Sequence, residues 1–409
     1  MPTPWQYRFA QNAKSTQSSA IRELFKVTAN PEVISFGGGL PAPEVFPIEE
    51  FKAACDKVLT TNGPMALQYS NSEGYAPLRE MIARQMDSFG MKLGLDNILI
   101  TTGTQQSIDL ISKLLLNNAE RLLVEDPTFL GALQIFGLFG ARFITVPTDN
   151  DGLQTDLLPE AFRTGPRFMY VIPTFQNPAG VTLSMKRREV LIALSDQYGI
   201  PIVEDDPYSA LRFEGETLTP LLALDAARLK TSDGYPAGNV IYCGSFSKTL
   251  APGLRLAWIA APPEAISKLV QIKQGADLHT PIFVQMAAYE CLRDGFLEKH
   301  ILKIREVYRE RRNVMLAAMD EHFPKGMEWT RPAGGLFLWA RLPEGMVSAE
   351  LLRTAIKMNV AFVPGNSFFA VDEKAGERYF RLNFSNMKPE RIQEGIKRLG
   401  KAIGEARKV

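Results

Sequence analysis

A lysine among small hydroxyl residues is the first candidate for covalent chemistry. Lys248 lies in Ser245-Phe246-Ser247-Lys248-Thr249, between the apolar runs 240–244 and 255–260. Burial between two such strands would desolvate the amine and lower its pKa, which makes it a usable nucleophile. Arg255 follows seven residues later and could bind an anion at the same strand ends. The alternative is a solvated surface lysine, the usual situation for this residue type.

Polar residues also follow three other apolar runs. Asp205 comes after 200–204, Asn177 after 168–173, and the turn 102–105 after 98–101. Ligands of open parallel sheets bind beyond the carboxyl ends of the strands, and a small-residue turn that opens a helix favours phosphate. Helix caps and plain turns are the alternatives. For Asp205 a cap is the more frequent role, but a carboxylate beside a doubly buried strand is costly without a cationic partner.

The elements that would position these residues alternate regularly. Strand-like runs occupy 98–101, 121–124, 142–146, 168–173, 200–204, 240–244 and 255–260, and helical patterns cover 105–116, 128–139 and 184–198. This spacing predicts an α/β fold whose mainly parallel sheet is flanked by helices.

A smaller α+β unit is predicted toward the C-terminus, after one long amphipathic stretch over 283–322. Its strands are 336–341, 361–363 and 379–384, and 388–407 is its closing helix. In the last strand Arg381 alternates with apolar neighbours, so it points either into solvent or into an interdomain cleft where it could bind a carboxylate. Segment 31–47 is rich in Pro and Gly and is predicted to run over the surface as an extended arm.

Composition excludes several classes of protein. The 409 residues are 45% hydrophobic with a net charge of +1, which is typical of a globular protein and gives no electrostatic footprint for nucleic acid or an anionic membrane. Three separated cysteines and three histidines without ligand spacing predict neither a disulfide framework nor a metal site. Without an apolar leader or an 18-residue apolar run, the sequence predicts a cytoplasmic protein.

One competing motif is present in part. Ser245-x-x-Lys248 matches the nucleophile motif of serine β-lactamases, but the S-D-N and K-T-G triplets that accompany it do not occur in the sequence. The G-x-x-x-x-G-K-[ST], G-x-G-x-x-G and G-x-S-x-G fingerprints do not occur either, which argues against common nucleotide-binding and hydrolase folds.

Taken together in chain order, the motifs resemble a known enzyme family. The segments SFSKTLAPGLRLAW, PTFQNPAG and IVEDDPYSAL are similar to those of fold-type I pyridoxal-phosphate aminotransferases, in the branch of the 2-aminoadipate and kynurenine enzymes. The MocR regulators carry a related domain. The resemblance runs from about residue 18 to 400 and implies an N-terminal arm over 1–47 that contributes to the small domain and to an active-site lid, a large cofactor-binding domain over 48–290 and a small domain over 291–409.

The resemblance assigns catalytic roles. It implies that Lys248 forms the Schiff base and moves the substrate proton, that Asp205 pairs with the pyridine nitrogen, and that Asn177 and Tyr208 contact the 3′-oxygen. Phe129 would stack on the ring, where relatives commonly carry Tyr. The same resemblance implies a phosphate site built from Gly103, Thr104, Gln105, Ser245, Ser247 and Arg255.

It also implies how substrates and a second subunit bind. Arg381 would bind the substrate α-carboxylate with help from Asn177, Gly39 would line the pocket, and Arg22 would lie in a segment that closes over it. Tyr69 matches a tyrosine that reaches the phosphate of a neighbouring subunit, which predicts a homodimer with active sites at the interface.

The expected activity is therefore amino-group transfer from an L-amino acid to a 2-oxo acid, with 2-oxoglutarate as the expected acceptor. A β-lyase or decarboxylase with the same cofactor is an alternative, because the cofactor stabilises several bond cleavages. A non-catalytic MocR-like effector domain is a further alternative, disfavoured because the resemblance begins too early to leave room for a DNA-binding domain. Substrate choice stays open: Arg22 suits a second carboxylate, whereas Phe36, Leu40 and Phe129 suit aromatic or branched side chains.

Overall fold

The computed structural model describes residues 3–15, 30–230 and 235–407. Arg22 lies outside these residues. None of the described helices is both long and apolar enough to cross a membrane.

An eight-stranded sheet carries the predicted runs in its centre. Its order is β2-β9-β8-β7-β6-β3-β4-β5. The strands are β2 (Ile98–Thr101), β3 (Arg121–Asp126), β4 (Arg142–Asp149), β5 (Gly152–Leu153), β6 (Met169–Val171), β7 (Ile202–Asp206), β8 (Val240–Ser245) and β9 (Ala257–Ala260). Strands β8, β7, β6, β3 and β4 are parallel, whereas β9 runs antiparallel to both its neighbours. The N-terminal end of β9 therefore lies at the same edge as the carboxyl ends of β2 and β8.

Helices cover both faces of this sheet because successive strand residues face opposite sides. Val203 of β7 packs in the cluster formed with α5 (Thr104–Leu115), α6 (Leu130–Leu138) and α10 (Pro263–Gln274). Ile202 packs in the opposite cluster with α4 (Ala76–Met86), α7 (Leu158–Arg163), α8 (Met185–Tyr198) and α9 (Leu221–Arg228). The α/β arrangement predicted from the alternating runs is confirmed.

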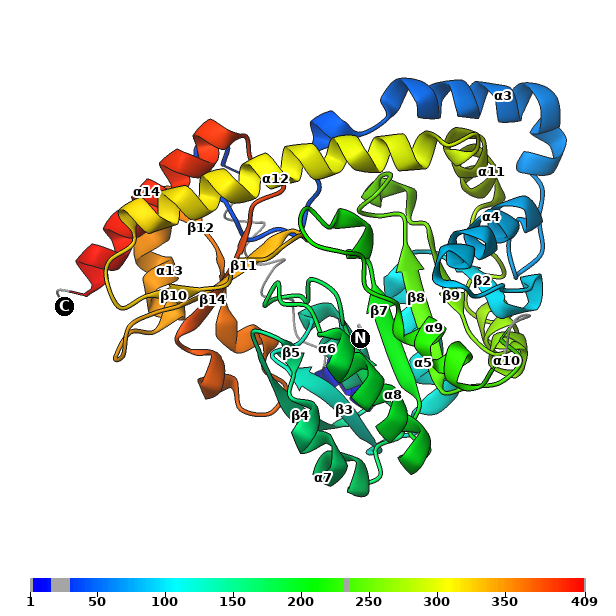
Figure 1. The fold of residues 1–409 in the computed structure, drawn as a ribbon, viewed down its shortest axis with the longest axis horizontal. Helices are drawn as coiled ribbons and strands as arrows, with labels where there is room; N and C mark the ends of the chain where they lie inside the picture. Colours follow the sequence, from blue (N-terminus) through cyan, green and yellow to red (C-terminus); the bar gives the residue numbers. More distant parts are fainter. Residues whose placement is uncertain (1–2, 16–29, 231–234, 408–409) are drawn as a thin grey trace.

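A four-stranded sheet forms the smaller unit, in the order β10-β11-β14-β13. Its strands are β10 (Glu328–Trp329), β11 (Phe337–Arg341), β13 (Val363–Pro364) and β14 (Tyr379–Asn383), packed with α13 (Ser348–Lys357) and α14 (Pro389–Ala406). Figure 1 shows the long helix α12 (Phe296–His322) reaching from the large sheet to α14. Phe380 and Leu382 of β14 pack with Ile396 of α14, as the strand alternation predicted.

The predicted helix over 283–322 is two helices. Helix α11 (Ile282–Leu292) ends before Asp294 and Gly295, whose φ angles of 62° and 76° are left-handed and incompatible with a continuous helix. Helix α11 packs against α3 (Ile48–Ala66), at the end of the molecule away from α14 in Figure 1. The amphipathic pattern hid this break because it continues on both sides.

The predicted surface arm over 31–47 is mostly buried. Within it, β1 (Ile34–Ser35) pairs in parallel with β12 (Val360–Ala361), and Ile34 and Phe36 are fully buried. Phe36 packs against Gly395 of α14, so it does not line a substrate pocket. Apolar side chains between the glycines and prolines therefore anchor this segment to the smaller unit. The helix α1 (Gln11–Ser15) precedes the segment. The domain boundaries given above stay a prediction.

Candidate active site

The candidate residues collect at one edge of the large sheet. Ala257 at the start of β9 pairs with both Thr101 of β2 and Ser245 of β8. The turn after β2, the segment after β8 and Arg255 before β9 therefore begin side by side. Asp205 lies one strand further along, opposite Cys243 of β8.

The turn after β2 contains a position that only glycine can occupy. Gly103 has a φ of 82°, and a Cβ added there would overlap the Arg255 guanidinium. Gly103 is the N-cap of α5, so the N–H groups of Thr104 and Gln105 have no acceptor within the helix. Ser245 ends β8 at the same edge of the sheet, and its hydroxyl accepts a hydrogen bond from the Ser247 N–H at 3.1 Å. These groups fit an anion such as phosphate.

Asp205 is buried inside β7 and is not a helix cap. Its Oδ2 accepts a 2.6 Å hydrogen bond from the Tyr170 hydroxyl, and its Oδ1 is buried without a partner among the described residues. Burial raises the pKa of Asp205 to about 7, while the Tyr170 bond opposes that rise. The capping role belongs to its neighbour Glu204, which accepts the N–H groups of Leu221 and Leu222 at the start of α9. The free Oδ1 fits a cationic N–H donor.

Lys248 is partly buried and donates a 2.7 Å hydrogen bond to the carbonyl of Gly39. Desolvation, followed by the nearby charges of Arg381 and Arg255, lowers the pKa of its amine to about 8. The expected desolvated lysine is therefore present, and Gly39 lies against it.

Arg381 is buried, with 1% of its surface exposed, and so does not face solvent. It donates to the Asn177 side-chain oxygen and to the Gly37 carbonyl, each at 2.7 Å, while its Nε has no partner among the described residues. Its guanidinium lies 4.3 Å from the Phe337 ring centre. Burial lowers the pKa of Arg381 to about 10, and no carboxylate of the described part offsets that loss.

Tyr208 joins these groups. Its buried ring packs edge-on against Phe337, and its hydroxyl lies close to Asn177, Arg381 and Asp205. Burial raises the pKa of this phenol above its ordinary value. The structure thus brings Lys248, Asp205, Tyr208, Asn177 and Arg381 into one site.

Other predicted residues lie differently. Phe129 is the N-cap of α6 and its ring covers Gly131. Tyr69 is 79% exposed, with its ring edge-on to His279. Gln105 is exposed, as expected of the first turn of a helix that opens toward a ligand.

Two contributors were missed from the sequence. The Gly37 carbonyl accepts a hydrogen bond from Arg381, and the Tyr170 hydroxyl donates one to Asp205. The role of Tyr170 had a signal in the sequence, because this tyrosine lies within the strand run 168–173, next along the chain to the run 200–204 that precedes Asp205. Nothing local in the sequence indicated the role of the Gly37 carbonyl.

Comparison with known proteins decides between the enzyme classes that this geometry could serve. The model of the family "Aminotransferase class I and II" matches residues 33–399. The chain belongs to this family. It is 46% identical to the 2-aminoadipate transaminase of Thermus thermophilus, over 98% of both chains. It is 43% identical to aromatic-amino-acid aminotransferase 1 of Thermococcus litoralis, over 98% of this chain and 95% of that one.

The solved structures include an aminotransferase with a cofactor adduct. LysN, the α-aminoadipate aminotransferase of Thermus thermophilus complexed with N-(5'-phosphopyridoxyl)-L-leucine, has a TM-score of 0.91 and 43% identity, and covers 99% of this chain and 100% of its own. The expected fold-type I architecture, the aminotransferase class and the pyridoxal-phosphate cofactor are confirmed. The residues present fit this cofactor, since the free Asp205 Oδ1 suits a pyridinium N–H and the Gly103 turn suits a phosphate.

Proposed function

We propose that this aminotransferase moves the amino group of 2-aminoadipate or of an aromatic L-amino acid to a 2-oxo acid, with 2-oxoglutarate as the principal acceptor. The observation that carries the proposal is the gathering of Arg381, Arg255 and Lys248, in which both guanidinium charges lower the pKa of the Lys248 amine. Such a set suits one phosphate and one α-carboxylate. The names of the relatives described above support the substrate class.

We assign the binding and activation of the cofactor to Asp205, whose Oδ1 has no hydrogen-bond partner among the described residues, and to the Lys248 amine. Pyridoxal phosphate, when bound, supplies an electron sink for negative charge on the substrate Cα. Asp205 would accept the pyridine N–H on Oδ1 and keep that nitrogen protonated, because pairing with a cation lowers the pKa that burial raises. Lys248 would hold the cofactor aldehyde and, once the substrate displaces it, carry the proton between Cα and C4′. Its pKa of about 8 lets its amine accept that proton near neutral pH.

We assign phosphate binding to Gly103, Thr104, Gln105, Ser245, Ser247 and Arg255, and ring stacking to Phe129. Asn177 and Tyr208 would bind the 3′-oxygen. Arg381 would bind the α-carboxylate with the N–H groups that Asn177 and Gly37 leave unused. Gly39 would border the substrate, and Arg22 would bind a distal carboxylate.

The first test combines a lysine variant with a substrate screen. Lys248→Ala should retain pyridoxal phosphate but lose at least about 10²- to 10⁴-fold in kcat, since general acid–base transfer alone contributes that much. Borohydride reduction of the wild type should attach the cofactor to Lys248. Full activity of Lys248→Ala would overturn the assignment.

The screen would offer amino donors with 2-oxoglutarate and measure glutamate formation. Arg22→Ala should penalise 2-aminoadipate far more than phenylalanine if Arg22 binds the distal carboxylate. Release of ammonia or carbon dioxide without a 2-oxo acid acceptor would instead indicate a lyase or a decarboxylase.

We also propose a homodimer in the cytoplasm, with Tyr69 of one subunit at the phosphate of the other. Exposed apolar side chains support a partner surface here, among them Met65, Leu67 and Leu278 close to Tyr69 and its neighbour His279.

A further inference from the structure

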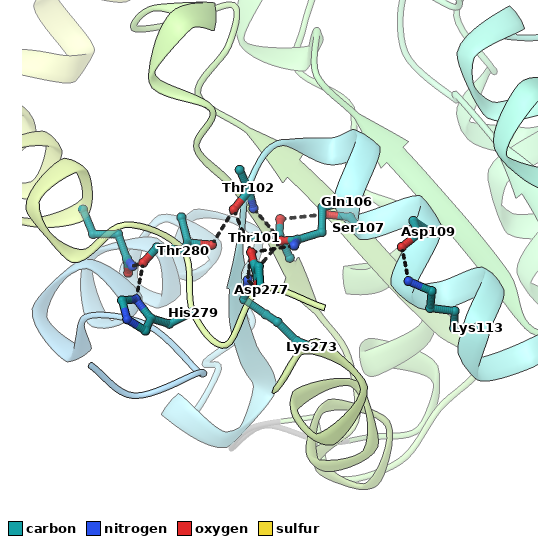
Figure 2. A network of polar contacts seen from close by, with 11 residues as sticks. Thr101, Thr102, Gln106, Ser107, Asp109, Lys113, Lys273, Asp277, His279 and Thr280 are labelled. Atoms are coloured by element: carbon teal, nitrogen blue, oxygen red, sulfur yellow. Dashed lines mark hydrogen bonds and ion pairs between the residues drawn. The ribbon is translucent and has the colours of Figure 1, made fainter. Parts of the chain in front are cut away.

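A buried lysine paired with a solvent-accessible aspartate lies behind the turn that we assign to phosphate. Lys273 of α10 has no exposed side-chain surface and lies 2.6 Å from Asp277 Oδ1. Figure 2 shows both residues beside Gln106 in the first turn of α5. Neither residue has a role in the assignments made above.

The pair is joined to the turn through the Gln106 side chain and directly through the Thr102 hydroxyl. Gln106 Oε1 accepts hydrogen bonds from Lys273 Nζ at 3.0 Å and from the backbone N–H of Thr102 at 2.8 Å. Gln106 Nε2 donates to Asp277 Oδ2 at 2.7 Å, and the Thr102 hydroxyl donates to the same oxygen at 3.1 Å. Both the backbone and the side chain of Thr102 are thus fixed one residue before Gly103.

Stability alone gives a poor account of this arrangement. Burying the Lys273 charge is expensive, and its partner Asp277 keeps 27% of its side chain exposed, where an ion pair contributes little to stability. A fully satisfied polar network, in contrast, selects one geometry. Lys273 would keep Gln106 in the rotamer that bonds Thr102, and this leaves the N–H groups that follow free for an anion.

We propose that Lys273, acting through Asp277 and Gln106, is a positioning residue that holds the Thr102–Gln105 turn in its phosphate-binding geometry. The inference rests on the proposed phosphate site. It predicts that Lys273 contributes to the affinity for the phosphate group and makes no contribution to the affinity for the rest of the cofactor.

The test compares two ligands that differ only in phosphate. The apoprotein is titrated with pyridoxal 5′-phosphate and with pyridoxal. The Kd of pyridoxal divided by the Kd of pyridoxal 5′-phosphate measures the contribution of the phosphate group to binding. Lys273→Met should reduce that ratio by about tenfold or more, the size of effect seen when groups that orient direct ligands are removed. The Kd of pyridoxal itself should not change.

The chain offers a matched control and a second variant. Lys113 and Asp109 form an i,i+4 pair at 2.7 Å on α5, more exposed and unconnected to the turn in Figure 2, so Lys113→Met should leave the ratio unchanged. Gln106→Leu leaves the Lys273–Asp277 pair intact but removes its link to the Thr102 backbone N–H, and it should reduce the ratio as Lys273→Met does. This variant keeps the test valid if Lys273→Met does not fold.

The outcomes distinguish a failure of the positioning role of Lys273 from a failure of the proposed phosphate site. An unchanged ratio in Gln106→Leu and in folded Lys273→Met, or equal losses for both ligands, would overturn the positioning role. Arg255→Met tests the site itself. If it also leaves the ratio unchanged, the proposed phosphate site is wrong; if it alone reduces the ratio, the site stands and only the role of Lys273 fails.

Discussion

Arg381 is buried with no carboxylate partner among the described residues, and such a guanidinium favours a carboxylate ligand over a neutral one. If it binds the α-carboxylate, that contact is common to every donor and acceptor, whatever the side chain. Arg381→Lys should therefore lower kcat/KM for glutamate, 2-aminoadipate and phenylalanine by a similar factor of about 10- to 100-fold, since an ammonium cannot reproduce the planar fork. Steady-state kinetics with the three donors measures this.

Arg341 provides the control for that experiment. It lies on the adjacent strand β11, stacks on Tyr379 and pairs with Glu328 near the surface. Arg341→Lys should leave kcat/KM unchanged. A loss at position 381 that is confined to one donor would show that Arg381 reads a side chain and not the α-carboxylate.

The pKa of Asp205 predicts how the stability of the apoprotein depends on pH. Burial raises this pKa from 3.8 to about 7, so the folded state holds a proton that the unfolded state releases at lower pH. The resulting contribution to the free energy of unfolding is complete below about pH 4 and is lost as the pH rises through 7. Asp205→Asn cannot titrate and should lose less stability between pH 5 and 8 than the wild type.

Urea unfolding of the apoprotein at several pH values measures this difference. The exposed Asp87→Asn variant is the control and should follow the wild type. Parallel curves for Asp205→Asn and the wild type would contradict the raised pKa.

At the scale of elements, the turn between β2 and α5 allows the effect of backbone strain to be separated from the effect on cofactor binding. Gly103 and Gly90 both have left-handed φ angles, of 82° and 75°, but a Cβ at Gly90 meets nothing within 4 Å. Alanine at Gly90, which is in the αL region, should cost about 1–2 kcal/mol of stability. At Gly103, where ψ is 158° and only glycine fits well, the cost should be about 1–3 kcal/mol. Only Gly103→Ala should displace the Arg255 guanidinium and weaken binding of pyridoxal phosphate.

Thermal unfolding and cofactor titration of the two variants distinguish these effects. Equal cofactor affinities in Gly103→Ala and Gly90→Ala would show that Arg255 does not bind the phosphate through this turn.

Elements set by local pattern were predictable, and those set by distant contacts were not. The runs at β2, β7 and β8 are apolar and buried on both faces, so their positions and their common edge followed from the sequence. Segment 31–47 has no local periodicity, because its structure comes from pairing with β12. Lys273 gave no local signal, since its partner Gln106 is 167 positions away. Motifs identified the reacting residues, whereas the groups that orient them required the tertiary structure.

At the scale of the whole molecule, the proposed dimer predicts a mass twice the 45.5 kDa of the chain, measured by light scattering. Tyr69→Ala should weaken cofactor binding, because the phenol would reach the phosphate of the other subunit. Tyr7→Ala is a matched control, since Tyr7 is 76% exposed and Tyr69 79%. A monomeric mass for the active enzyme, or equal cofactor affinity in the two variants, would contradict this assignment.

The bond between Arg381 and the Gly37 carbonyl joins residues 344 positions apart. A chain growing on the ribosome carries the Gly103 turn, Asp205 and Lys248 long before it carries Arg381. Nascent chains that end before β14 therefore possess the elements for the cofactor but lack the receptor for the α-carboxylate. Because such long-range closure comes late and slowly, we expect substrate recognition to be the last property gained during synthesis. Arrested chains of increasing length, assayed for cofactor absorbance and for its response to glutamate, would reveal that order.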